Sequence, residues 1–210
     1  MFEAGQADSS AVITEQRGSL AIIHLTRPSE RNSLTLSTLK ALEQTVSGLL
    51  ESRDTTALIF TGTQDVFASG ANIRELAALT PETARAFAHL GQNLFHKIAH
   101  ARQLTLAAIN GYCMGGGLDL ALACHLRFAS SAAIFAHPGA RLGIITGWGG
   151  TQRLPRLVGP ARALEMLTTA RRLSSSEAHE IGLINRVCDP VLDCAVEFVR
   201  QRERGFDTRH

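Results

Sequence analysis

The sequence carries almost no net charge. It has 21 Lys and Arg against 19 Asp and Glu, which gives +2 over 210 residues. Proteins that bind nucleic acid through its phosphates need a basic surface, so this balance offers no electrostatic basis for a nucleic-acid partner. Arginines do gather near the end, at Arg200, Arg202, Arg204 and Arg209. We interpret them as the charged face of a terminal helix.

Cysteine is scarce, and its spacing fits neither a disulfide framework nor a metal site. Cys113, Cys124, Cys188 and Cys194 form no Cys-x-x-Cys pair, and their neighbours are mostly apolar. We therefore interpret the four as reduced core thiols, and we expect no zinc site and no other metal.

Targeting and membrane-spanning segments are also missing. The start, MFEAGQADSS, has neither the basic residues nor the apolar run of a signal peptide. No uncharged apolar stretch approaches the roughly 20 residues that a transmembrane helix needs. We expect a cytoplasmic protein, without a membrane partner, whose residues 1–10 form a disordered tail. With 45% hydrophobic and 19% charged residues, the rest has the composition of a single globular domain with a sizeable core.

Segments typical of strands alternate with segments of helical spacing. Short apolar runs predict strands at 19–26, 56–61, 104–109, 126–130 and 133–136. Apolar periodicity, prolines and capping residues predict helices at 34–50, 82–101, 113–124, 149–158, 160–170 and 191–204, and one from a capping box at 174–177. The alternation predicts the α/β class.

Three glycines, Gly115 to Gly117, stand near the start of the helix predicted at 113–124, CMGGGLDLALAC. Because glycine costs about 1 kcal/mol relative to alanine inside a helix, three together need an explanation. A helix N-terminus presents unpaired N–H groups and a partial positive charge, and glycines let a ligand touch that backbone. No P-loop lysine follows, and the pattern is not Gly-x-Gly-x-x-Gly. It indicates either an anion site or close helix packing.

A second loop, FASGAN at 67–72, also follows a predicted strand and leads toward a helix. Alone it is typical of an ordinary turn. Together, the two loops could aim two backbone N–H groups at one point, which would be an oxyanion hole able to hold the oxygen of a thioester enolate.

Five blocks of sequence, these two loops among them, resemble the crotonase (enoyl-CoA hydratase/isomerase) superfamily. They are RPSERNSL at 27–34, FASGAN at 67–72, AAINGYCMGGGLDLALACHLRFAS at 107–130, LGIITGWGGTQRLPRLVG at 142–159 and ARALEMLTTARRLSSSEAHEIGLINRV at 161–187. The resemblance implies a spiral of β-β-α units in a core at residues 11–190. It also implies an acyl-CoA thioester as substrate, no separate cofactor because coenzyme A is part of that substrate, and assembly as trimers or paired trimers.

The resemblance also assigns residues to the site. It implies that the backbone N–H groups of Ser69 and Gly116 are the oxyanion donors, and that Asp119 occupies the position of one of two catalytic glutamates. The loops at 28–33 and 69–72 would line the path of the pantetheine and adenine. The substrate-binding residues implied in this way are Arg31, Asn32, Ala68, Ser69, Gly70, Ala71, Asn72, Gly115, Gly116, Gly139 and Trp148.

Two departures from the family pattern bear on the chemistry. Asp119 is one methylene shorter than glutamate, and a shift of about 1 Å at a reacting group can change a rate as much as 100-fold. The position of the second glutamate is Gly139, which has no side chain. Hydration needs one group to activate water and another to protonate carbon, so efficient hydration is in doubt, whereas thioester binding is not.

Three other features have two interpretations each. His137 could stand in as an acid or base, or it could be a packed or solvent-facing histidine. Trp148 could narrow the acyl pocket or fill the space left by Gly139. His96 and His100 have the i,i+4 spacing of a metal site, but no acidic third ligand accompanies them, so we expect a surface pair.

The resemblance implies several helices after LINRV, which in the family cover the active site and help to form the trimer. About twenty residues follow here, so we expect a shortened C-terminal helical region at 191–210 and an exposed apolar face unless a partner chain covers it. Our hypothesis is an enoyl-CoA hydratase/isomerase-type lyase or isomerase with Asp119 as general acid/base. The alternatives are an enoyl-CoA isomerase, an acyl-CoA decarboxylase and a non-catalytic acyl-CoA-binding protein.

Overall fold

The computed structural model describes residues 11–207, with side chains to residue 204. The tail expected at residues 1–10, and Arg209, lie outside this range. The strands are β1 (Val12–Arg17), β2 (Leu20–Leu25), β3 (Ser33–Leu34), β4 (Ala57–Thr61), β5 (Val66–Ala68), β6 (Gly70–Ala71), β7 (Leu104–Ile109), β8 (Tyr112–Met114), β9 (Leu126–Ala129), β10 (Ile134–Ala136), β11 (Leu173–Ser174) and β12 (Arg186–Val187). The helices are α1 (Leu36–Glu51), α2 (Ile73–Ala77), α3 (Pro81–Ala99), α4 (Gly116–Ala123), α5 (Gly150–Val158), α6 (Pro160–Thr169), α7 (Ser175–Glu180) and α8 (Val191–Asp207), with 3-10 turns at Pro28–Glu30 and Pro138–Leu142.

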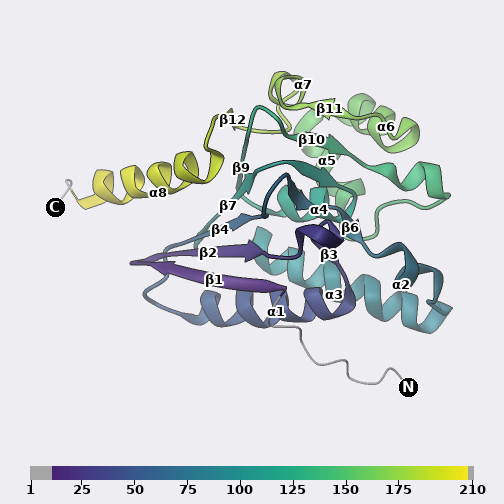
Figure 1. Ribbon diagram of the computed structural model, residues 1–210, viewed down its shortest axis with the longest axis horizontal. Helices are drawn as coiled ribbons and strands as arrows, with labels where there is room; N and C mark the ends of the chain where they lie inside the picture. The colour runs from purple at the N-terminus through teal and green to yellow at the C-terminus, as the bar shows by residue number, and fades with distance from the viewer. Residues whose placement is uncertain (1–10, 208–210) are drawn as a thin grey trace.

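The strands form two main sheets, and the chain steps from one to the other as it advances. The larger sheet has the order β1-β2-β4-β7-β9-β12, and the smaller has the order β11-β10-β8-β5. In three successive units a strand of the larger sheet is followed by a strand of the smaller one: β4 then β5, β7 then β8, β9 then β10. Helices follow each pair, and all pairings between these units are parallel. This repetition confirms the expected α/β fold with β-β-α units (Figure 1).

Side-chain alternation explains why the larger sheet is buried on both faces. Successive residues of a strand point to opposite faces, and β2, β4 and β7 are apolar at nearly every position. On one face Ile23, Phe60 and Ile109 join the main core with α1 and α3. On the other, Ile22 and Ile59 pack in a second cluster with Val199 of α8. The last helix therefore covers a sheet face (Figure 1).

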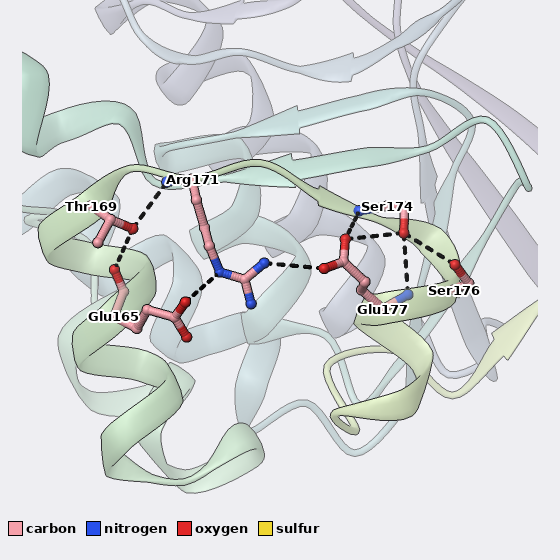
Figure 2. A network of polar contacts seen from close by, with 6 residues as sticks. All are labelled: Glu165, Thr169, Arg171, Ser174, Ser176 and Glu177. Carbon is pink, nitrogen blue, oxygen red and sulfur yellow. Dashed lines mark hydrogen bonds and ion pairs between the residues drawn. The ribbon is translucent and has the colours of Figure 1, made fainter.

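The segment between α6 and α7 is held by polar contacts as well as by the burial of Leu173 in the main core. The Arg171 guanidinium pairs with Glu165 of α6 at 2.8 Å and with Glu177 of α7 at 3.2 Å. Ser174 and Glu177 form the predicted capping box at the start of α7 (Figure 2). These contacts set the direction in which the chain leaves α6.

Eight elements were not predicted: the helix α2 and the strands β1, β3, β5, β6, β8, β11 and β12. The β8 strand takes up the first residues of the predicted helix 113–124, so that helix begins at Gly116 instead. Within residues 11–207, no helix combines the length and apolar character needed to cross a membrane.

Candidate active site

The site predicted from sequence opens into a cavity of about 1080 Å³, which exceeds the usual volume of a drug-sized ligand pocket. Its walls come from the loop before β3, the β6–α2 region, α3, the start of α4 and the segment 137–148. Of the predicted residues, it brings together Arg31, Ser69, Ala71, Asn72, Gly115, Gly116, Asp119, Gly139 and Trp148.

The two glycine-containing loops pack directly against each other. A Cβ added at Gly70 would lie 2.6 Å from the Gly116 nitrogen, and one at Gly117 would lie 2.2 Å from the Ala68 carbonyl oxygen. Both positions therefore need glycine because backbone meets backbone. Gly116 is the first residue of α4, where an N–H group has no carbonyl partner within the helix. The triple glycine thus serves close packing and leaves a donor at the cavity wall.

The Ser69 N–H, expected to point toward a ligand, is used within the protein. It donates to the Arg31 carbonyl oxygen at 3.0 Å. Asn32, expected to bind substrate, holds the same two segments together and does not line the cavity. Its amide donates to the Val66 carbonyl at 2.8 Å, and its Oδ1 accepts from the Arg27 N–H at 2.8 Å. Ala68 and Gly70 are buried beneath the cavity surface.

Asp119 projects from the first turn of α4 into a nearly closed space and is 1% exposed. Its Oδ2 accepts a short hydrogen bond from the Thr146 hydroxyl. Its Oδ1 faces His137 Nε2 at 3.6 Å. A Cβ at Gly150 would lie 2.2 Å from Oδ1, so α5 also approaches the carboxylate through a glycine. The carboxylate therefore lies between the Thr146 hydroxyl and the His137 ring, and all three residues line the cavity.

Burial shifts the pKa values of Asp119 and His137 in opposite directions, and each shift favours the neutral form of the group. Desolvation raises the pKa of Asp119 from 3.8 to about 7, against the opposing effects of the Thr146 hydrogen bond and the Arg153 charge. Desolvation lowers the pKa of His137 from 6.5 to about 4. Between these two values, Asp119 is protonated and His137 is neutral. Of the two interpretations of His137, the structure therefore shows a buried, packed histidine. It packs beside Asp119, the predicted acid.

The position of the missing carboxylate is closed by the chain itself. A Cβ at Gly139 would lie 2.6 Å from the Ile144 carbonyl oxygen. The turn Pro138–Leu142 and the residues after it therefore occupy the space into which a side chain at 139 would extend. Trp148 does not fill this space.

Trp148 instead forms part of the cavity wall near the glycine loops. It is 4% exposed, and its ring is in contact with Phe87 and Phe95 at centroid distances of 5.3 and 5.8 Å. A Cβ at Gly116 would lie 2.4 Å from Trp148 Cζ3, and one at Gly91 would lie 2.5 Å from the indole. The indole thus lies in the cavity wall beside Gly116, and its role in narrowing an acyl pocket stays a prediction.

Thr146 is the site residue that sequence reasoning missed. It lies 27 residues after Asp119 in a loop without apolar periodicity, so only the tertiary fold brings its hydroxyl to the carboxylate. Arg153 was missed for a similar reason. Its guanidinium donates to the Trp148 carbonyl at 3.0 Å and contributes to the charge environment of Asp119.

The remaining candidates lie away from the cavity. The rings of His96 and His100 stack at 3.9 Å on the exposed side of α3, as expected of a surface pair. Cys113 and Cys124 are free core thiols, and the free Cys188 and Cys194 are half-buried near α8.

Comparisons with known proteins show which family this chain is similar to. A family model described as enoyl-CoA hydratase/isomerase matches residues 15–204. The chain is 41% identical to crotonyl-CoA hydratase of Syntrophomonas wolfei over 180 residues, covering 85% of this chain and 69% of the relative. It is 37% identical to short-chain-enoyl-CoA hydratase of Clostridium acetobutylicum over the same shares. The crystal structure of enoyl-CoA hydratase from Bacillus anthracis superposes with a TM-score of 0.87 at 34% identity, covering 91% of this chain and 76% of that one.

Proposed function

Because this chain belongs to the enoyl-CoA hydratase/isomerase family, we propose that it is an acyl-CoA enzyme that stabilises a thioester enolate and transfers a proton through Asp119. The proposal rests mainly on the close approach of Gly70 to Gly116 at the cavity wall, next to Asp119. Among the cavity residues between 107 and 148, Asp119 is the only one with a carboxylate. Relatives named as hydratases support the substrate class.

In the proposed site, the first N–H of α4, at Gly116, donates to the thioester oxygen. The positive end of the helix stabilises the charge that develops there. A second donor comes from the Ser69–Ala71 segment. The Ser69 N–H can take this part only after it releases the Arg31 carbonyl oxygen. Losing one such donor typically reduces kcat about 100- to 1000-fold.

Asp119 is proposed as the general acid/base. Its raised pKa of about 7 suits this role, since a group that gives and takes protons near neutral pH works best when its pKa is near the operating pH. Because Gly139 replaces the second carboxylate, Asp119 has to act alone. A single carboxylate can move one proton between two carbons of an enoyl chain. Double-bond isomerisation is therefore the reaction we favour for the carboxylate acting by itself.

The test measures three reactions with wild type and Asp119→Asn. Crotonyl-CoA hydration and 3-enoyl-CoA isomerisation are followed by absorbance, and a malonyl-type CoA by mass. Exchange of the C2 protons of butyryl-CoA with deuterated water reports enolate formation without a full reaction. We expect exchange in wild type and its loss in Asp119→Asn. Tight binding of all these thioesters with neither exchange nor turnover would contradict the proposal and favour a binding protein.

A further inference from the structure

We propose that Thr146, Asp119 and His137 form a proton relay, in which the Thr146 hydroxyl meets the substrate and the Asp119–His137 pair behind it holds the proton. The inference rests on the proposed enolate chemistry and names the groups that deliver its proton. It differs from a direct role for the carboxylate, because the most exposed of the three groups is a hydroxyl.

The order of the three groups follows from their burial. All three residues line the cavity, but Thr146 is partly exposed, whereas Asp119 and His137 are 1% and 3% exposed. Each Asp119 oxygen has its own neighbour, with Oδ2 bonded to the Thr146 hydroxyl and Oδ1 turned toward His137 Nε2. The Asp119 carboxylate therefore connects an outer hydroxyl to an inner imidazole.

Two buried polar atoms in the described chain point to one another without a hydrogen-bond partner. They are Asp119 Oδ1 and His137 Nε2, which are 3.6 Å apart. A buried polar atom left unpaired is costly, and a movement of about half an ångström would bring these two within normal hydrogen-bond range. A single proton shared between them satisfies both atoms.

The surroundings favour one proton on the pair near neutral pH. Arg153 of α5 is the cation that acts on Asp119, and its guanidinium donates to the Trp148 carbonyl. Cys113 of β8 also interacts electrostatically with Asp119, but burial raises the pKa of this thiol well above its usual value, so it stays neutral. Burial lowers the pKa of His137 to about 4 and raises that of Asp119 to about 7, so the pair binds one proton between these limits.

The proposed step conserves protons and electrons. When an enolate collapses, the electron pair of its carbon–carbon double bond takes the proton of the Thr146 hydroxyl. For this step the Thr146 hydrogen turns from Asp119 Oδ2 toward the carbon, and rotation of the Asp119 carboxyl group brings its proton from the His137 side to the Thr146 side. The Thr146 oxygen takes this proton as it gives up its own, so threonine is unchanged and the carboxyl becomes a carboxylate. Reversal of the same transfers removes a C2 proton. No oxidant, reductant or metal takes part.

The experiment compares two conservative variants at the outer position. Thr146→Ser keeps a hydroxyl and Thr146→Val keeps the shape without it. We expect Thr146→Val to slow C2 exchange about 100-fold or more, as loss of a proton-transfer group does, and Thr146→Ser to restore most of the rate. Equal rates in Thr146→Val and wild type, in a protein whose exchange is lost in Asp119→Asn, would overturn the relay while leaving the proposed function intact.

His137 is tested through pH dependence, because a structural role alone would not move it. His137→Gln should shift the pH midpoint of exchange away from the wild-type value, whereas His179→Gln, at an exposed histidine on α7, should leave it unchanged. An identical midpoint in wild type and His137→Gln would remove His137 from the relay.

A second measurement needs no activity and uses the wild-type chain. The imidazole Cε1–H signal of His137, assigned by its absence in His137→Gln, is followed by NMR against pH. We expect an inflection near pH 7 in wild type, where the pair loses its proton, and no such inflection in Asp119→Asn. The same titration curve in both proteins, or no inflection near pH 7 in wild type, would contradict the shared proton even if every variant were inactive.

Discussion

At the residue scale, Asp119 shows how one side chain can be predicted in type and position but not in surroundings. Its place two residues after the triple glycine indicated an acid at the mouth of a helix N-terminus. The sequence did not indicate that the Thr146 hydroxyl would bond to this acid, or that His137 would lie on its other side. Those neighbours come from other loops, and no spacing rule links them to α4.

The opposite pKa shifts of the pair predict opposite effects of pH on stability. The folded state holds a proton on Asp119 that the unfolded state releases above pH 3.8, so this group destabilises the fold as pH rises toward 7. His137 does the reverse, because the unfolded state holds a proton up to pH 6.5 that the folded state loses near pH 4. The two effects largely cancel in wild type.

Substitution of either Asp119 or His137 should reveal the pH dependence of stability that the other residue causes. Relative to wild type, the unfolding free energy of His137→Gln should fall as pH rises from about 4 to 6.5, by up to about 1.4 kcal/mol per pH unit. That of Asp119→Asn should rise over about the same window. Urea unfolding at several pH values measures both slopes. Parallel curves for the two variants would contradict the shifted pKa values.

At the element scale, α8 matters because it completes the burial of the larger sheet. Val199 is fully buried against the strands, and farther along the helix Glu203 accepts hydrogen bonds from Ser19 at 2.5 Å and Thr56 at 2.7 Å. The helix therefore contacts the sheet through both an apolar stripe and a polar end. The exposed apolar face that we expected lies instead beside the cavity, where Ile73, Ile144 and Ile145 are 59%, 47% and 67% exposed.

We predict that Val199→Asp destabilises the protein by about 3 kcal/mol or more, because it places an unpaired charge in an apolar contact. Arg200→Asp, at the exposed neighbour, should change stability by no more than about 0.5 kcal/mol. Chemical denaturation of the two variants beside wild type measures the difference. Equal stabilities would mean that α8 does not pack on the sheet in solution.

At the scale of the whole molecule, the alternation of strands and helices predicted the class, and the family resemblance implied the β-β-α order. The short elements were predicted poorly. Strands of two or three residues, such as β5 and β8, carry no measurable alternation. They form because neighbouring strands of the smaller sheet are already in place. The long apolar strands β4 and β7 were predicted to within a residue, because burial on both faces leaves an unmistakable apolar run.

Binding should stabilise the whole fold if the cavity receives an acyl-CoA. At a concentration about 100 times Kd, a ligand that binds only the folded state adds about 2.7 kcal/mol, which corresponds to a rise in Tm of roughly 5–10 °C for a chain of this size. Butyryl-CoA should produce such a rise in both wild type and Asp119→Asn. ATP should not, since the chain lacks a P-loop lysine. Thermal unfolding followed by circular dichroism would test this, and an equal rise with ATP would point to nucleotide rather than thioester recognition.

The contact between Gly139 and the Ile144 carbonyl limits how this protein could change. A glutamate at 139 cannot simply be added, because its Cβ would lie 2.6 Å from that oxygen. The segment would have to move, and the same segment carries Thr146 two residues later. A side chain at 139 therefore requires a shift of the segment that places the Thr146 hydroxyl on Asp119. We expect any substitution at 139 to alter the Thr146–Asp119 contact as well, so the two positions are coupled through the loop between them.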